Sequence, residues 1–256
     1  MTAVIIQARI GSSRLRGKTL ANLAGRTVLS HVLMRCCAIK GVDEVCCAIP
    51  DSSENDVVAD EANRCGVSVF RGSETDVLDR YYKAAKQIGA DVILRVTSDC
   101  PLIDPEIAAS VLQLRENENS DYACNNLPPT WPHGLDCEAF TFAWLERAAR
   151  EAEAKTEREH VTPYIRHHRA ARKANLKAPK DHLQNHRWTL DTPEDLEFLD
   201  AIFARIKAPE KEFSYAGPLR IAETDPTLCA MNAEHRRMST DNITDGVIQK
   251  IYAPDG

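Results

Sequence analysis

Several features that define other classes of protein are absent from this sequence of 256 residues. No apolar run is long enough to span a bilayer, and Met1 is followed directly by a strand-like segment, so we expect neither a membrane span nor a signal peptide. The formal net charge is −6, which argues against nucleic acid as the main partner. No C-x-x-C motif occurs among the nine cysteines, so we expect no zinc site and a reducing, cytoplasmic location.

The order of the apolar patterns that are present predicts an α/β protein. Short β-type runs are expected at residues 3–6, 44–49, 67–70 and 91–97. Helical spacing predicts helices at residues 27–38, 54–65 and 75–88, the last capped by Ser73 or Thr75. Asp104 and Pro105 would begin a further helix as its cap and first-turn proline. Such alternation is typical of a mostly parallel sheet with helices on both faces.

The second half of the sequence is less regular. Strands are expected at residues 122–125, 135–140 and 187–190, and helices at residues 141–154, 158–168 and 193–206. Beyond Lys207 the pattern fades, apart from a weak helical stretch near residues 227–238. We therefore expect one domain at residues 1–207 and an extension of unknown role at residues 208–256.

The loop after the first strand is unusually basic. It carries glycines and serines at Gly11, Ser12, Ser13 and Gly17, and cations at Arg9, Arg14, Arg16 and Lys18. Glycine lets the backbone approach a ligand, and backbone N–H groups with fixed cations suit a polyphosphate. The Walker A spacing G-x-x-x-x-G-K-[ST] is missed, because five residues separate Gly11 from Gly17. The sequence therefore predicts a phosphate loop but disfavours a P-loop kinase.

Two aspartates follow predicted strands. Asp99 ends the segment V-I-L-R-V-T-S-D, and Asp191 ends R-W-T-L-D. In parallel sheets ligands bind at the carboxyl ends of strands, and Mg²⁺ is held by one or two carboxylates, water and substrate phosphates. We therefore expect Asp99 and Asp191 to hold Mg²⁺, although Asp99 could instead cap the turn before Pro101. Asp195 is expected to complete a capping box with Thr192.

These segments resemble the GT-A-type sugar nucleotidyltransferases. Within them the chain is similar to the spore coat polysaccharide biosynthesis protein F-like cytidylyltransferases, which are akin to acylneuraminate and KDO cytidylyltransferases. The family pattern is Q-A-R-x-G-S-x-R-L-P-G-K-x-L, and this chain departs from it only at Arg16, where proline is usual. Segments T-x-D-C-P-L-I-D and D-T-P-E-D-L also match. The resemblance covers roughly residues 2–206 and implies a Rossmann-like GT-A fold and a homodimer.

The resemblance also implies roles for single residues. Arg9, Arg14, Lys18 and Asp99 would carry catalysis by holding the triphosphate and, together with Asp191, Mg²⁺. The nucleotide would be bound by Gly11, Ser12 and Ser13, and by Arg71, Ser73 and Arg80 of the segment R-G-S-E-T-D-V-L-D-R. For these last three residues an ordinary capped helix with a surface Asp79–Arg80 pair stays an open alternative.

Two later segments are implied to face the acceptor. Residues 133–138 resemble the family's R-G-L-D-V-E, with His133 in place of a common arginine, and residues 157–164 match E-R-E-H-V-T-P-Y. The acceptor-binding residues implied are His133, Asp136, Glu138, Arg158, Glu159 and His160. Arg158 suits bidentate binding of a carboxylate. A structural role for His160 is equally open.

The function implied by the resemblance is transfer of CMP from CTP to an acidic sugar, of ulosonic or sialic type, for cell-surface polysaccharide biosynthesis. Such a reaction needs in-line positioning and neutralised phosphate charge. A GT-A glycosyltransferase is an alternative, although its usual D-x-D motif would require aspartate where Thr97 stands. A nucleotidyltransferase for a phosphorylated or phosphonate acceptor, and a non-catalytic nucleotide-binding protein, also stay open.

Overall fold

The computed structural model describes residues 1–11, 14–208, 213–235 and 245–254. Ser12 and Ser13, which were expected to bind nucleotide, lie outside these residues. The strands are β1 (Thr2–Gln7), β2 (Asn22–Leu23), β3 (Arg26–Thr27), β4 (Glu44–Pro50), β5 (Ser68–Gly72), β6 (Val92–Thr97), β7 (Tyr122–Cys124), β8 (Glu138–Thr141), β9 (Lys173–Lys177) and β10 (Val247–Ile251).

The helices alternate with these strands along the chain. They are α1 (Val28–Cys37), α2 (Asp56–Arg64), α3 (Val77–Ile88), α4 (Pro105–Asn117), α5 (Phe142–Glu151), α6 (Lys155–His160), α7 (Pro163–His167), α8 (Pro193–Phe203), α9 (Ala216–Thr224) and α10 (Pro226–Met231). Short 3₁₀ helices lie at η1 (Lys18–Leu20), η2 (Ser53–Asn55) and η3 (Leu183–Asn185). Among the described residues no helix is long and apolar enough to cross a membrane.

One mixed sheet organises the molecule. Its strand order is β10-β9-β7-β8-β6-β1-β4-β5, and every neighbouring pair is parallel except the two that involve β8. The strands β1 and β6 lie in the middle of the sheet, and their buried side chains are apolar, as expected for strands covered on both faces. The predicted α/β fold with a mostly parallel sheet is confirmed.

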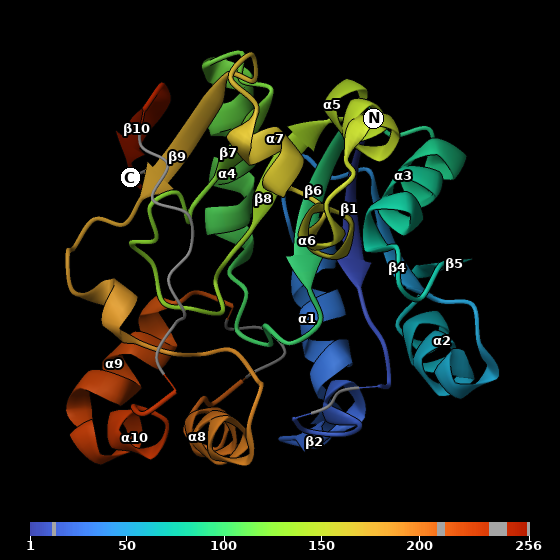
Figure 1. Ribbon diagram of the computed structural model, residues 1–256. Coiled ribbons are helices and arrows are strands. Elements are labelled where there is room, and N and C mark those ends of the chain that lie inside the picture. Colours follow the sequence, from blue (N-terminus) through green and yellow to red (C-terminus); the bar gives the residue numbers. More distant parts are fainter. Residues whose placement is uncertain (12–13, 209–212, 236–244, 255–256) are drawn as a thin grey trace.

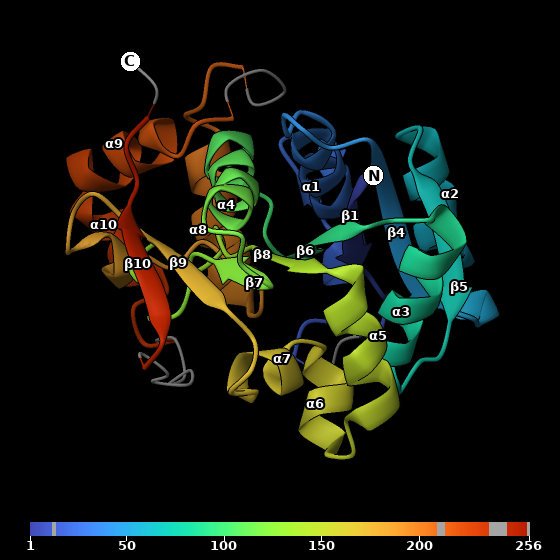
Figure 2. The ribbon, with the colours of Figure 1, turned by 90° about the horizontal axis from the view of Figure 1, so that it is seen from above.

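Helices cover both faces of this sheet, and each face has its own apolar core. In the view from above, α1, α2, α4, α8 and α9 lie on one side of the strands and α3, α5, α6 and α7 on the other (Figure 2). The larger core joins the first group to side chains such as Ile6 and Val96, and the smaller joins α3, α5 and α7 to Ile5 and Ile93. Alternate residues of one strand therefore serve opposite cores, which is the period of two expected of a strand.

Most of the predicted helix starts are confirmed. Asp104 accepts hydrogen bonds from the backbone N–H groups of Glu106 and Ile107, and Thr192 and Asp195 form the expected capping box on α8. The start of α3 differs from the prediction. Its N-cap is Asp76, whose side chain accepts from the backbone N–H of Asp79. Ser73 lies three residues earlier, and its Oγ accepts from the backbone N–H of Asp76. The observed N-cap thus lies one position after Thr75 and three positions after Ser73, the two predicted caps.

Other predictions for the second half are wrong in detail. Residues 187–190 form no strand, but an extended segment with one isolated bridge between His133 and Arg187. The helix expected at residues 158–168 is divided into α6 and α7 by a sharp turn at Val161. The strand β9 was not predicted.

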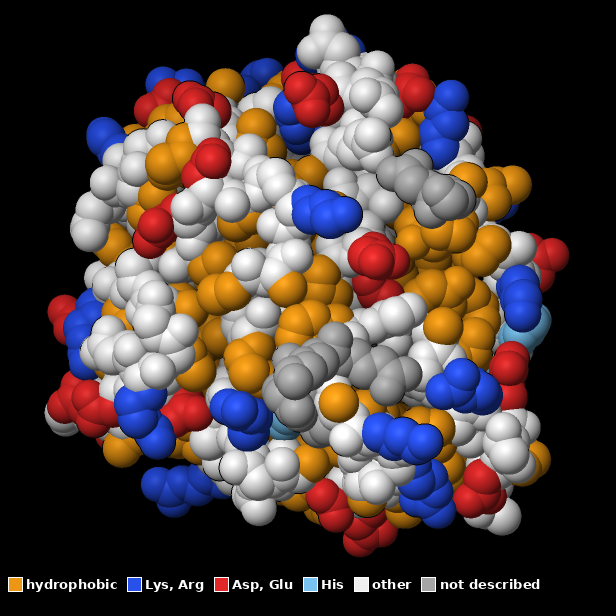
Figure 3. Space-filling model, turned by 180° about the vertical axis from the view of Figure 1, so that it is seen from behind, with side chains coloured by type: hydrophobic (Ala, Val, Ile, Leu, Met, Phe, Trp, Pro, Cys, Tyr) orange, Lys and Arg blue, Asp and Glu red, His pale blue; other side chains and the backbone are white. Residues whose placement is uncertain are grey.

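The described residues beyond 207 pack onto the rest of the chain. Leu219, Leu228 and Tyr252 belong to the larger core, and β10 extends the sheet beside β9. Seen from behind the view of Figure 1, the molecule presents many apolar side chains near its middle, with a few charged ones among them and most of the charged ones around the edge (Figure 3). The boundary at residue 207 stays a prediction, and residues on both sides of it share one core.

Candidate active site

The basic loop leaves the carboxyl end of β1 and is held by side chains outside it. Asn55 Oδ1 accepts from the backbone N–H of Ile10 at 2.9 Å, and Thr19 Oγ1 donates to the carbonyl of Arg9 at 3.0 Å. Gly17 closes the loop with φ +72°, a left-handed conformation that other residues adopt at a cost. The two described ends of the loop, which carry Arg9 and Lys18, are therefore held in place.

Lys18 joins the two aspartates Asp99 and Asp191. Its Nζ lies 3.0 Å from Asp99 Oδ2 and 2.7 Å from Asp191 Oδ1, and it also donates to the carbonyl of Leu190 at 2.8 Å. Arg14 Nη2 lies 3.2 Å from the same Asp191 oxygen, although its side chain is largely exposed. One charged cluster is thus formed by four residues predicted from sequence, Arg14, Lys18, Asp99 and Asp191. The first and last of them are more than 170 positions apart in the sequence.

Electrostatics keep this cluster charged. Burial lowers the pKa of Lys18, but the neighbouring Asp99 and Asp191 outweigh burial and the pKa lies above its usual value. Burial raises the pKa of Asp99, but the Lys18 ammonium and a hydrogen bond from Thr97 outweigh it and the pKa lies below its usual value. At neutral pH the Lys18 ammonium therefore lies against the Asp99 carboxylate.

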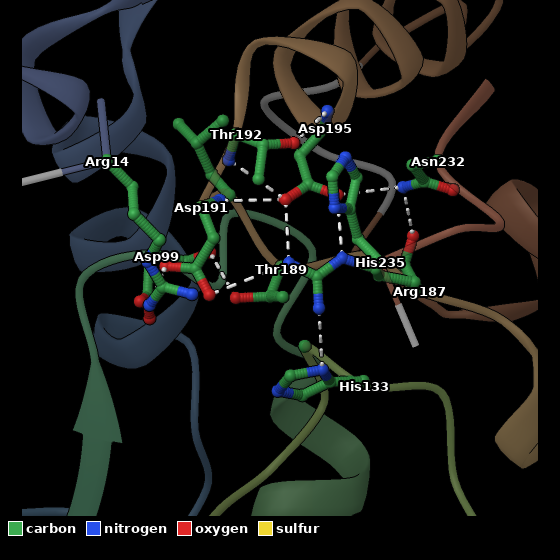
Figure 4. Close-up of polar contacts among 12 residues, drawn as sticks. Arg14, Asp99, His133, Arg187, Thr189, Asp191, Thr192, Asp195, Asn232 and His235 are labelled. Atoms are coloured by element: carbon green, nitrogen blue, oxygen red, sulfur yellow. Dashed lines mark hydrogen bonds and ion pairs between the residues drawn. The ribbon is translucent and has the colours of Figure 1, made fainter. Parts of the chain in front are cut away.

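The position of Asp191 is fixed by a second carboxylate, Asp195, which is fully buried. Asp195 Oδ2 accepts from the backbone N–H groups of Asp191 at 2.9 Å and Thr192 at 3.1 Å. Arg187 donates to both Asp195 oxygens, each at 2.8 Å, and Asn232 Nδ2 donates to Oδ1 at 3.0 Å. Figure 4 shows Arg187 between Asp195 and His133, beside Asp191. This network ties Asp191 to the chain beyond residue 207.

The segment that carries Asp191 lies against two loops rather than in the sheet. Trp188 N donates to the carbonyl of His133 at 2.6 Å, and Leu190 N donates to that of Asp99 at 2.8 Å. Gly134 permits this approach: its φ is +120°, and a Cβ there would lie 2.5 Å from the carbonyl carbon of Trp188. The close packing at Gly134 therefore brings Asp191 beside Asp99.

These groups border a cleft of about 490 Å³ at the carboxyl ends of β1 and β6. Of the residues predicted from sequence, nine line it: Arg9, Gly11, Arg14, Lys18, Arg80, Asp99, Glu159, His160 and Asp191. The cleft is also lined by residues not singled out from sequence, which are Gln7, Ala8, Thr19, Glu74, Thr75, Val77, Thr97, Ser98 and Lys155. Seven of these nine stand within two positions of a predicted residue, the exceptions being Val77 and Lys155, so nearness to a motif was the signal available. The cleft lies at the carboxyl ends of the strands, where ligands are expected to bind in an open parallel sheet.

Arg80 is a buried cation at this cleft. Only 2% of it is exposed, burial lowers its pKa, and Arg9 lowers it further. Arg80 Nη1 donates to the carbonyl of Ser73, and Glu74, which lines the same cleft, raises the pKa of Arg80 without outweighing burial. A buried guanidinium is costly without an anion nearby, so Arg80 is suited to meet an anionic ligand.

Other predicted residues are placed outside the cleft lining. Arg71 pairs with Asp56 at 2.6 Å on the surface, and Ser73 accepts a backbone hydrogen bond in the turn before α3. His133 Nδ1 lies 3.3 Å from Arg187 Nη1, and Asp136 accepts from the backbone N–H of Gly134. These side chains hold the structure around the cleft.

Arg158 and Glu138 are engaged internally. Arg158 donates to Asp76 Oδ2 from Nε at 2.7 Å and from Nη2 at 2.6 Å, and its Nη1 donates to the last carbonyls of α5. Glu138 is 3% exposed and pairs with Arg95. Burial raises the pKa of Glu138, but Arg95 and Arg166 outweigh burial and the pKa lies below its usual value. The structure does not bring either residue to the cleft lining.

The donor set at Asp99 and Asp191 fits Mg²⁺, because two carboxylates already lie within 3.0 Å of one cationic atom, Lys18 Nζ. In the described ranges no group of three or more His, Cys, Asp and Glu residues is arranged to hold a metal by itself. A metal here would therefore need phosphate or water to complete its ligands, as Mg²⁺ usually does.

The mostly parallel sheet, the basic loop and the paired carboxylates of Asp99 and Asp191 define an α/β nucleotidyltransferase. The chain belongs to the cytidylyltransferase family, whose sequence profile matches residues 3–218. The resemblance to the spore coat polysaccharide F-like cytidylyltransferases is thereby confirmed, and cytidylyltransferase activity is supported.

Three comparisons illustrate the relationship. The spore coat polysaccharide biosynthesis protein SpsF of Bacillus subtilis is 34% identical over 207 residues, covering 78% of this chain and 85% of that protein. A 3-deoxy-manno-octulosonate cytidylyltransferase of Anaeromyxobacter sp. is 35% identical over 116 residues, 44% of this chain and 47% of that protein. The solved structure of a cytidylyltransferase from Leptospira borgpetersenii has a TM-score of 0.83 and 32% identity, covering 89% of this chain and 96% of that one.

Proposed function

We propose that this cytidylyltransferase transfers CMP from CTP to an acidic sugar of ulosonic or sialic type, with Mg²⁺ as cofactor. The observation that carries the proposal is the cluster of Lys18 with Asp99 and Asp191 in a cleft that also contains Arg9, Arg14 and Arg80. An in-line displacement at phosphorus needs such charge neutralisation and no covalent enzyme intermediate. The names of the relatives support a sugar acid acceptor and a role in polysaccharide biosynthesis.

In this reaction the chain's own residues act on the triphosphate. Arg9, Arg14 and Lys18 bind its oxygens and offset their charge, with Arg80 supplying a further buried cation. Asp99 and Asp191 would hold Mg²⁺, which when bound supplies charge neutralisation and orients the phosphates. An acceptor hydroxyl oxygen forms a bond to the α-phosphorus, the bond to the β-phosphate oxygen breaks, and pyrophosphate leaves. The hydroxyl proton passes to solvent.

The acceptor lies, in this proposal, between the phosphate loop and the α6 wall of the cleft. That wall contributes Lys155, Glu159 and His160, whose side chains are exposed to the cleft. Since Arg158 is paired with Asp76, Lys155 and His160 are the groups of α6 suited to receive a carboxylate. All nine cysteines are free, which supports the cytoplasm as the location. The homodimer stays a prediction.

A thermal-shift panel of the four nucleoside triphosphates, each with and without Mg²⁺, tests the nucleotide. Ligands that bind only the folded state raise the melting temperature, and about 100 Kd of CTP with Mg²⁺ should raise it by roughly 5 °C. Pyrophosphate release is then measured with CTP and either 3-deoxy-manno-octulosonate or N-acetylneuraminate. A shift with nucleotide sugars alone, or release only with phosphorylated acceptors, would contradict the proposed substrate.

A further inference from the structure

The turn between α6 and α7 has an unusual backbone. Val161 has φ +71° and ψ −55°, and Thr162 N donates to the carbonyl of His160 at 2.8 Å, which together define a γ-turn centred on Val161. A β-branched residue rarely adopts a positive φ, and glycine would adopt it at little cost. Such strain persists only where the surroundings over-determine the backbone, and it concentrates at functional sites.

The surroundings of this turn are strongly constraining. The Val161 side chain is fully buried in the smaller core, which includes Phe140 and Leu145. The next residue, Thr162, is also buried, and its Oγ1 donates to Glu138 Oε1 at 2.7 Å. The residue before the turn, His160, lines the cleft. The direction in which His160 leaves the helix is therefore set by a buried hydrogen bond two residues further on.

Glu138 connects this turn to the floor of the cleft. Its Oε1 also accepts from the hydroxyl of Tyr122 at 2.6 Å, and its Oε2 is paired with Arg95. Arg95 Nη2 in turn donates to Gln7 Oε1 at 3.2 Å, and Gln7 lines the cleft. Because arginine can only donate, this contact fixes the amide oxygen of Gln7 and leaves its NH₂ group available to other partners.

We propose that Glu138 is a positioning residue, which through Thr162 and Arg95 fixes His160 and Gln7 in the lining of the cleft. The importance of this role for catalysis rests on the proposed function, because His160 and Gln7 would then face the nucleotide and the acceptor. Glu138 was expected to contact the acceptor directly. In this proposal it acts on the cleft through Thr162 and Arg95 instead. A carboxylate that is buried and shared among three donors is suited to this role because its geometry is over-determined.

The test uses the imidazole signals of the full-length protein in NMR spectra, without nucleotide or acceptor. The His160 signal is assigned as the one missing from His160→Gln. Thr162→Val keeps the side-chain shape but removes the donor to Glu138, and should move the His160 signal by more than its line width. Thr162→Ser keeps the hydroxyl and should leave the signal near its wild-type position. Glu138→Gln should move it as Thr162→Val does.

Two controls separate positioning from general damage. Thr224→Val removes an exposed threonine hydroxyl of α9, which donates to the carbonyl of Arg220 at 2.7 Å, and should leave the His160 signal unchanged. The His31 signal should be constant in every variant, because His31 is buried in the other core, with Nε2 2.7 Å from the carbonyl of Leu23. An unmoved His160 signal in Thr162→Val, or an equal shift in Thr162→Ser, overturns the proposal. Since no substrate is added, this result is independent of whether CTP proves to be the nucleotide.

Discussion

Arg187 and Asp195 form a bidentate ion pair in which Nε donates to Oδ1 and Nη2 to Oδ2, both at 2.8 Å. The carboxylate is fully buried and also holds the backbone of Asp191. Removing its charge in Asp195→Asn leaves Arg187 without its full partner, so we expect a loss of about 3 kcal/mol in the free energy of unfolding. Urea denaturation with an unchanged m-value would measure it. Glu194→Gln, a change in an exposed neighbour, should move the midpoint little.

The same pair predicts how stability depends on pH. Burial raises the pKa of Asp195, but hydrogen bonds from Arg187 outweigh it, so the folded-state pKa lies below the unfolded value of about 4. The stabilisation is therefore complete above about pH 4 and is lost as the pH falls through the folded-state pKa. Between about pH 5 and pH 2.5 the wild type should lose more unfolding free energy than Asp195→Asn. Parallel losses in urea titrations at each pH would contradict this.

Features set by neighbouring residues could be predicted from the sequence. The cap of α8 at Thr192 and Asp195, and that of α4 at Asp104, depend on positions within one turn of each other. The approach of Lys18 to Asp99 was also predictable, because they follow the parallel strands β1 and β6, whose carboxyl ends meet at one edge of the sheet. Asp191 was expected there as well, but it is placed by a segment that is not a strand.

Features set by distant partners could not be predicted. Arg158 has the spacing of an acceptor ligand, but its partner Asp76 stands 82 positions earlier, and no local pattern reveals the pair. Residues 187–190 have a strand-like pattern because Trp188 and Leu190 are buried. Their backbone N–H groups, however, donate to the carbonyls of His133 and Asp99, which lie in loops. Alternating burial therefore predicted a strand where no neighbouring strand is available to pair with.

Gly134 should be essential for both stability and catalysis. In Gly134→Ala the new Cβ would lie 2.5 Å from the backbone carbon of Trp188 at a φ of +120°, and backbone cannot move as a side-chain end can. We expect a loss of about 3 kcal/mol in unfolding free energy and lower pyrophosphate release, because the segment carrying Asp191 must shift. The matched control is Gly11→Ala, since a Cβ at Gly11 meets nothing within 4 Å and its φ is not positive. Equal melting temperatures for the two variants would show that the approach at Gly134 is not tight.

Lys18 and Asp99 should be essential for the reaction without being essential for the fold. Lys18→Ala removes the cation between two carboxylates, and Asp99→Asn removes one of them, so each should lower kcat/KM for pyrophosphate release by at least about 100-fold. Far-UV circular dichroism should stay like that of the wild type. Lys40→Ala, at an exposed lysine outside the cleft, should retain full activity. Near-wild-type turnover by Lys18→Ala or Asp99→Asn would refute the assigned site.

The pair of Arg158 with Asp76 offers a direct test between a structural role and binding of the acceptor. Lysine at position 158 cannot donate twice to one carboxylate or reach the α5 carbonyls in the same geometry. If the pair joins α6 to α3, Arg158→Lys should lower the free energy of unfolding by about 1–2 kcal/mol. Asp76→Asn should lower it similarly, and the double variant should cost less than the sum of the two single variants, because the two residues are in contact.

If Arg158 instead binds the acceptor, Arg158→Lys should raise the KM for the acceptor, Asp76→Asn should leave that KM unchanged, and neither variant should change the free energy of unfolding. Urea denaturation of the three variants, together with KM for CTP and for the acid, distinguishes these outcomes.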